Sequence, residues 1–209
     1  GGAVPLFVTS PTSVDYPLDF KYDMIYFSYI YCSSGCSADG YGTWSGDVYR
    51  IKTFNNIDPG TWRWSNLFAL NQPVTVKPSV GVDKRGNIWV YYGTGRFLHV
   101  DDRLNLTAQN YYGIKDPCYF ANCTTTVANS TNILNSSNFT VNSDGTITPA
   151  LTANTLGSGR PSANITRFDD LANFMQDKGE GWKITLGASE RVIVNGFVVG
   201  GIAGFGSYT

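Results

Sequence analysis

The sequence predicts an all-β fold of antiparallel sheets, with one short helix and a long loop excursion rich in Thr, Asn and Ser. Aromatic residues make up 14% of the 209 residues, 13 of them Tyr, and these residue types favour strands. The chain also has 23 Gly, which favour tight turns. Short apolar segments alternate with Gly, Pro, Asn and Asp, as in strands joined by turns.

Composition limits the class of function. Hydrophobic residues make up 42% of the chain, which is enough for a packed core. Charged residues make up only 15% and the net charge is -1, so we expect no nucleic-acid binding and no attachment to membranes through basic residues. The chain has no run of about 20 apolar residues, so we expect no membrane-spanning helix. Its first residues do not resemble a signal peptide.

The first strand signals come early in the chain. Residues 24–31 are aromatic and β-branched and too few for a helix, and residues 46–54 alternate apolar and polar side chains. Residues 58–60, Asp-Pro-Gly, form a predicted turn.

Residues 61–70 are predicted to form the next strand. We expect Trp62 and Trp64 to face the core, together with Leu67 or Phe68.

The clearest hairpin follows. Val80 and Val82 alternate with small residues, residues 83–87 form the turn, and residues 88–92 return. We expect the Gly93-Thr94-Gly95 segment to turn the chain again and residues 96–100 to form the partner strand.

The second half of the chain is less regular. Residues 119–161 are dense in Thr, Asn and Ser and predict a loop or flap, with a short hairpin around Asp144-Gly145. A helix is expected after Thr166 as its cap, with Asp169 in the first turn. Its apolar face would hold Phe168, Leu171, Phe174 and Met175. Residues 182–186 and 190–206 are strand-like.

The four cysteines form two close pairs in the sequence, Cys32 with Cys36 and Cys118 with Cys123. Three pairings are formally open, and two local disulfides are the simplest. A zinc site is the alternative, but neither spacing is typical of zinc ligands and the single histidine, His99, is distant. Disulfides predict an oxidising compartment.

Several segments in this order resemble the C-terminal region of the PilY family of type IV pilus biogenesis factors and tip-associated adhesins. The matching positions are Pro78, Gly93-Thr94-Gly95-Arg96-Phe97, Tyr112-Gly113-Ile114-Lys115-Asp116, Gly181-Trp182 and Glu190-Arg191-Val192. They extend over most of the chain, roughly from Ile25 to Thr209.

The resemblance implies a partial β-propeller, in which residues 1–209 form one propeller-like domain or a fragment of a larger one. Gly46 and Gly95 each precede an alternating segment, at a spacing within the roughly 40–50 residues of a propeller blade. The resemblance to the PilY family also implies an exported, extracellular and pilus-associated protein without catalysis. Its expected partners are pilin or minor pilin subunits, the remainder of a longer precursor, or a surface or host receptor.

The family often carries a calcium loop with closely spaced aspartates. Here Asp15, Asp19 and Asp23 are the calcium candidates, but they lack the two-residue spacing and central Gly that wrap oxygens around one ion. Solvated carboxylates at a strand edge are the alternative.

Other chemistry has weaker support. His99 precedes Asp101 and Asp102, but no nucleophile motif accompanies it, so a surface or packing role is expected. Glu190 and Arg191 are expected to form part of an ion pair with a structural role. The same is expected of Arg96. Two further functions stay open: a subunit that decorates or builds an extracellular filament, and a secreted carbohydrate-acting enzyme.

Overall fold

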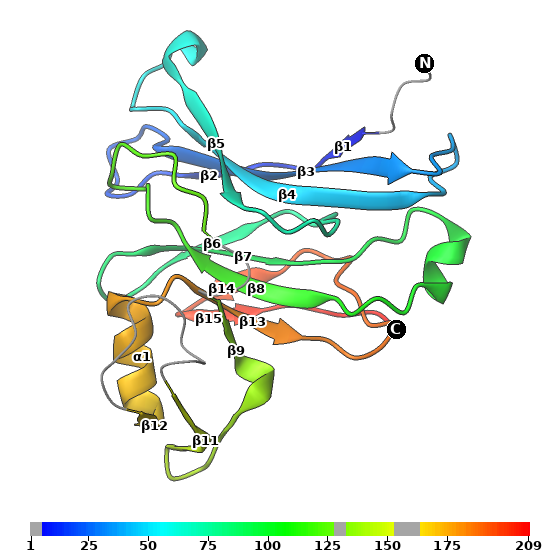
Figure 1. The fold of residues 1–209 in the computed structure, drawn as a ribbon. Coiled ribbons are helices and arrows are strands. Elements are labelled where there is room, and N and C mark those ends of the chain that lie inside the picture. Colours follow the sequence, from blue (N-terminus) through cyan, green and yellow to red (C-terminus); the bar gives the residue numbers. More distant parts are fainter. Residues whose placement is uncertain (1–5, 128–132, 153–163) are drawn as a thin grey trace.

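Two β-sheets lie one on the other and form the body of the protein (Figure 1). The computed structural model describes residues 6–127, 133–152 and 164–209. Three short 3-10 helices, Pro59–Thr61, Val100–Leu104 and Ser136–Asn138, lie in the connections. The all-β prediction is confirmed.

The first sheet is antiparallel and is built around a long hairpin. Its strands are β1 (Leu6–Val8), β2 (Thr12–Val14), β3 (Met24–Ser34), β4 (Thr43–Lys52) and β5 (Arg63–Phe68). Strands β1 and β2 both pair with β3, which pairs with β4, and β4 pairs with β5. Burial alternates along β3 and β4, so the sheet has one core face and one outer face.

The second sheet contains the predicted hairpin and distant parts of the chain. Its strands, in spatial order, are β6 (Ser79–Val82), β7 (Ile88–Gly93), β8 (Asn110–Lys115), β13 (Gly181–Thr185) and β9 (Ile133–Asn135). Only β9 pairs in parallel. Strand β9 and Val127, which forms an isolated bridge with Phe68, both belong to the predicted excursion of residues 119–161. The described parts of this excursion therefore pair twice with strands of the two large sheets.

Smaller elements cover the second sheet. Strands β10 (Thr140–Val141), β11 (Thr146–Leu151) and β12 (Ile165–Arg167) form a three-stranded sheet next to α1 (Phe168–Asp177). They enclose a second small core, with Leu171 and Phe174 of the helix against Ile147 and Leu151. Strands β14 (Phe197–Val199) and β15 (Ile202–Gly204) form the C-terminal hairpin.

The main core lies between the two large sheets. From the first sheet it receives Met24, Tyr26, Val48 and Phe68, and from the second Val90, Tyr92, Tyr112 and Ile114. The rings of Phe68 and Tyr112 meet across the interface with centroids 5.3 Å apart. The two sheets are therefore joined by a continuous apolar and aromatic layer.

Three local predictions were wrong. Trp64 is 68% exposed, because the register of β5 places it beside Ile51 on the outer face, whereas Leu67 and Phe68 are both buried. Residues 96–100 form no strand: the chain enters the 3-10 helix at Val100 with His99 as its N-cap. Helix α1 begins one residue later than expected, with Arg167 at the N-cap and no side-chain cap bond.

Candidate functional site

Two of the sequence segments that carry the resemblance pack against each other. The Cα of Gly93 faces the side chain of Val192, and a Cβ on Gly95 would lie 2.5 Å from the Cβ of Arg191. Gly95 also has a φ of +129°, which other residues rarely adopt. The Gly93-Thr94-Gly95 segment therefore lets the C-terminal chain pass directly over it.

A second pair of these segments meets in the second sheet. Gly113 on β8 is the register partner of Trp182 on β13, and a Cβ on Gly113 would lie 2.5 Å from Cε2 of the indole. Trp182 therefore lies across the backbone of β8, where it also contacts Tyr91 and Tyr111.

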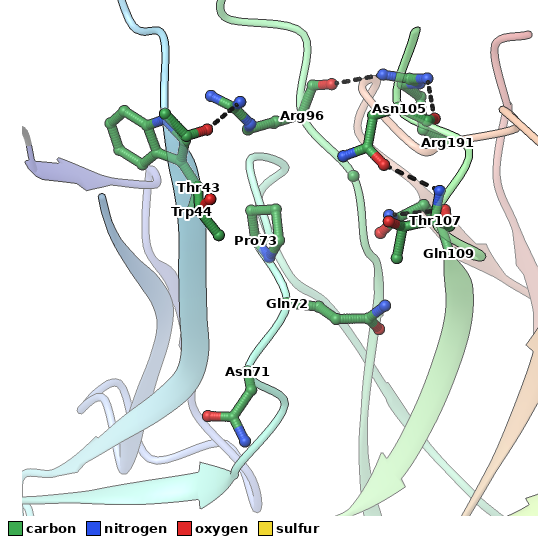
Figure 2. A pocket seen from close by; sticks show the side chains of 12 residues that line it. Thr43, Trp44, Asn71, Gln72, Pro73, Arg96, Asn105, Thr107, Gln109 and Arg191 are labelled. Carbon is green, nitrogen blue, oxygen red and sulfur yellow. Dashed lines mark hydrogen bonds between the residues drawn. The ribbon is translucent and has the colours of Figure 1, made fainter. Parts of the chain in front are cut away.

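Where the two large sheets separate at one end, they leave a polar pocket of about 350 Å³ (Figure 2). One wall is the start of β4 and the β5–β6 connection, with Thr43, Trp44 and Asn71. The other is the chain that enters β8, with Asn105, Thr107 and Gln109. Arg96 and Arg191 lie near each other at one end of the pocket.

Arg96 connects the two walls. Its guanidinium donates to the carbonyls of Gly40 and Gly42, pairs with Asp102 at 2.6 Å, and lies over the Trp44 ring at 5.4 Å. Burial lowers the pKa of Arg96, and the Asp102 carboxylate opposes this shift. The guanidinium stays charged at neutral pH because its ordinary pKa is so high.

Arg191 is 5% exposed and is bound mainly by backbone oxygens. It donates to the carbonyls of Ser189, Arg96, Asp102 and Asn105. The predicted ion pair with Glu190 was wrong, because Glu190 instead accepts from Gly187 N and from the Ser207 hydroxyl.

The loop after Arg96 is held by Asp102 rather than by strand pairing. Its carboxylate accepts from the backbone N–H groups of Leu98 and His99 at 2.8 and 3.0 Å. His99 Nδ1 accepts from Asp101 N, which completes a capping box. His99 therefore has a structural role in this loop.

The outer face of the first sheet carries an aromatic surface, defined here as Phe27, Tyr29, Tyr31, Tyr49 and Trp64. Tyr49 is central: its ring lies 5.8 Å from Phe27, 6.2 Å from Tyr29 and 5.7 Å from Trp64. A hollow of about 410 Å³ opens between these four rings. This face of the first sheet points away from the second sheet (Figure 1).

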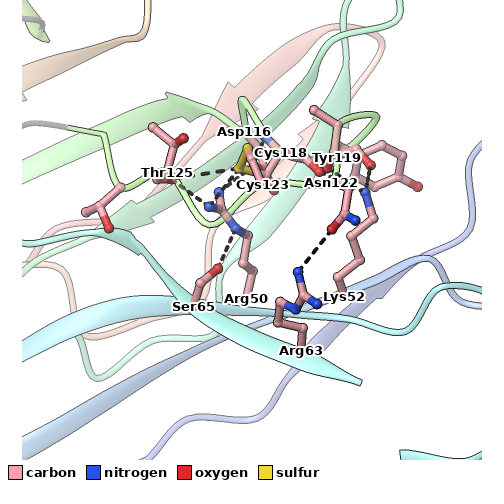
Figure 3. The surroundings of a disulfide bond; sticks show 12 residues. Arg50, Lys52, Arg63, Ser65, Asp116, Cys118, Tyr119, Asn122, Cys123 and Thr125 are labelled. Carbon is pink, nitrogen blue, oxygen red and sulfur yellow. Dashed lines mark hydrogen bonds and ion pairs between the residues drawn. A yellow bond between two sulfur atoms is a disulfide. The ribbon is translucent and has the colours of Figure 1, made fainter. Parts of the chain in front are cut away.

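Both predicted disulfides are present, Cys32–Cys36 and Cys118–Cys123, with Cα atoms 5.8 and 5.2 Å apart. The second anchors a loop over the end of β4 (Figure 3). Lys52 Nζ donates to the carbonyls of Cys118, Tyr119 and Ala121, so this short loop encloses the ammonium group.

The calcium candidates do not converge. Asp23 accepts from Tyr16 N and the Tyr119 hydroxyl, Asp15 accepts from Asp19 N, and Asp19 accepts from Lys21 N and Asn55 Nδ2. In the part of the chain that the structure describes, no three His, Cys, Asp or Glu side chains group as metal ligands. Nor is any helix in those residues long and apolar enough to cross a bilayer.

The architecture is that of an all-β, propeller-like protein, built from antiparallel sheets packed face to face. Among solved structures, it is similar to the crystal structure of the Pseudomonas aeruginosa PilY1 C-terminal domain, with a TM-score of 0.62 and 16% sequence identity. The alignment covers 99% of this chain and 45% of that one, so this chain spans less than half of that structure. No protein-family model matches the sequence, and no curated protein matches it significantly.

Sequence patterns did not reveal the polar pocket or the aromatic surface. The alternation of residues 46–54 indicated which of their side chains share a face, but not which face is covered. The pocket lies between segments far apart in the sequence, so no local pattern could have found it.

Proposed function

We propose that this chain is a non-catalytic protein of type IV pilus assembly or pilus-linked adhesion that binds pilin or minor pilin subunits outside the cell. The observation that carries the proposal is the fold likeness to the PilY1 C-terminal domain over 99% of the chain. The order of the PilY-like segments in the sequence and the two disulfides, which are typical of oxidising compartments, support it further.

The aromatic surface is the docking site that we assign to this function. Trp and Tyr are enriched where protein interfaces derive most of their binding energy. Tyr and Trp have only two side-chain torsions, so little side-chain entropy is lost when they bind. Large exposed apolar patches on soluble proteins commonly mark interaction sites.

Binding of purified pilin and minor pilin subunits to the immobilised chain tests the proposal. We expect Trp64→Ala and Tyr49→Ala each to weaken binding by about tenfold or more, as at interface hot spots. The matched control is Val199→Ala, an exposed apolar residue of β14 in the C-terminal hairpin. Circular dichroism and thermal melting of each variant verify the fold. Absence of binding to every pilin, or equal binding by the variants, contradicts the proposal.

The proposal has one close alternative, a subunit that coats or builds the filament. Quantitative labelling of isolated fibres distinguishes the two. One or a few copies per fibre are expected for an assembly factor or adhesin, whereas about one copy per pilin subunit indicates a coat protein.

A further inference from the structure

The polar pocket between the sheets has an unusual distribution of charge. Among the described residues that line it, two are arginines and none is Asp or Glu. Asp102 neutralises one of the two guanidinium groups, through its ion pair with Arg96, and Arg191 is held by carbonyl oxygens. The pocket therefore has an excess positive charge, carried by two largely buried guanidinium groups, and electrostatic attraction is stronger near buried groups than in water.

Both arginines retain donors. Of the five N–H donors of a guanidinium, Arg96 uses three and Arg191 uses four within the described part of the chain. Charge-assisted hydrogen bonds from such groups to a carboxylate are stronger than those between neutral groups.

Neutral polar groups line the rest of the pocket, and several have no protein partner in the described residues. The Oε1 of Gln109 is buried without a hydrogen bond, and the residue as a whole is only 7% exposed. The side chain of Asn71, the Nδ2 of Asn105 and the hydroxyls of Thr43 and Thr107 are exposed and also have no protein partner there. A buried acceptor such as Gln109 Oε1 is costly unless a donor reaches it.

The remaining wall is flat and apolar. Trp44 and Pro73 form this wall. The Arg96 guanidinium lies over the Trp44 ring and holds the indole in place. An aromatic face next to hydrogen-bonding groups suits a ligand with one apolar side and a polar edge. The volume of about 350 Å³ lies at the small end of ligand pockets.

We propose that this pocket binds an acidic sugar unit, a uronic acid. The carboxylate lies towards Arg96 and Arg191, and hydroxyls bond to the exposed side chains of Asn71, Asn105 and Thr107. The C–H face of the pyranose ring lies against Pro73, beside the largely buried Trp44. A peptide carboxylate fits less well, because it would leave most of these amides and hydroxyls unpaired.

Isothermal titration of the full chain tests the proposal with four probes: D-galacturonate, D-glucuronate, D-galactose and N-acetylglycine. We expect one of the uronates to bind about tenfold more tightly than the neutral sugar and than N-acetylglycine, because only it satisfies both the arginines and the amides. In NMR spectra the side-chain NH₂ signals of Asn71, Asn105 and Gln109 should shift on addition of the uronate.

Variants locate the site. Thr107→Val and Asn71→Gly should each weaken uronate binding by about three- to tenfold, the loss of one or two hydrogen bonds. Glycine is chosen at Asn71 because its φ is +55°. Thr140→Val, an exposed threonine on β10, is the matched control.

Three results would overturn the proposal. They are no uronate binding at millimolar concentrations, equal binding of N-acetylglycine and uronate, and uronate binding that the pocket variants leave unchanged. The pocket does not include Trp64 or Tyr49, so this test and the pilin experiment can fail independently.

Discussion

Arg50 and Asp116 form an ion pair that joins the two large sheets. Arg50 lies on β4 of the first sheet, and Asp116 directly follows β8 of the second, 66 residues away. The Nη1 and Oδ1 atoms are 2.5 Å apart, and the side chains are 1% and 0% exposed. Their other hydrogen-bonding capacity is also used, by Ser65, Thr125 and the Tyr26 hydroxyl, so this pair belongs to a fully connected buried network.

Removing one member of this pair should be costly. Arg50→Met leaves the Asp116 carboxylate buried without its cation, which we expect to lower the free energy of unfolding by about 3–5 kcal/mol. Urea denaturation measures the loss. The control is Arg85→Met, which removes the exposed Arg85–Asp177 pair and should cost about 1 kcal/mol or less. Equal losses in the two variants would show that burial of the Arg50–Asp116 pair does not matter.

Two buried tyrosines in the same core should respond in opposite ways to loss of the hydroxyl. Tyr26 donates to Asp116 at 2.7 Å, whereas the Tyr92 hydroxyl is buried without a partner in the described structure. Tyr26→Phe should therefore destabilise the protein by about 1.5–3 kcal/mol, and Tyr92→Phe should be neutral or stabilising. Thermal and urea unfolding of the two variants compare them directly. A destabilised Tyr92→Phe would reveal a bound water or other partner at that hydroxyl.

The contact between Gly113 and Trp182 should tolerate no side chain. Gly113→Ala places a methyl group 2.5 Å from the indole, so either the ring or β8 must move. We expect a loss of roughly 1–3 kcal/mol, typical of overpacking. The fluorescence of Trp182 should change as well. Gly187→Ala, where the nearest atom is a side-chain oxygen of the exposed Glu190 carboxylate at 3.2 Å, is the control and should have little effect.

Alkaline pH should destabilise the protein through its buried tyrosines. Burial raises the pKa of Tyr91, Tyr111 and Tyr112 to about 12. Unfolded tyrosine has a pKa of about 10. Because the unfolded state loses these protons first, their contribution to stability is complete below about pH 10 and is lost as the pH rises towards 12.

Urea midpoints measured between neutral pH and about pH 11 test this pH dependence. The Tyr111→Phe variant removes one of the titrating groups, so its midpoint should fall less steeply with pH than that of the parent chain. A pH profile that is unchanged in the variant would assign the alkaline loss to other groups.

Short-range patterns predicted much of the fold. Alternation and turn chemistry identified β3, β4, the β6–β7 hairpin, β13 and the helix, because these depend on neighbouring residues. The local disulfides were predicted for the same reason, since each joins cysteines only 4 or 5 residues apart. Prediction failed at residues 96–100, where the Asp102 carboxylate, paired with Arg96, accepts from the N–H groups of Leu98 and His99 that a strand would have used.

Local residue patterns specify that this protein is built from short aromatic strands and two sulfur-bridged loops. Packing between distant segments specifies which face of the first sheet is exposed, and it brings Arg96 and Arg191, 95 residues apart, into one pocket. Periodicity sets only how side chains alternate along a strand, because burial and charge balance depend on contacts between segments far apart in the chain.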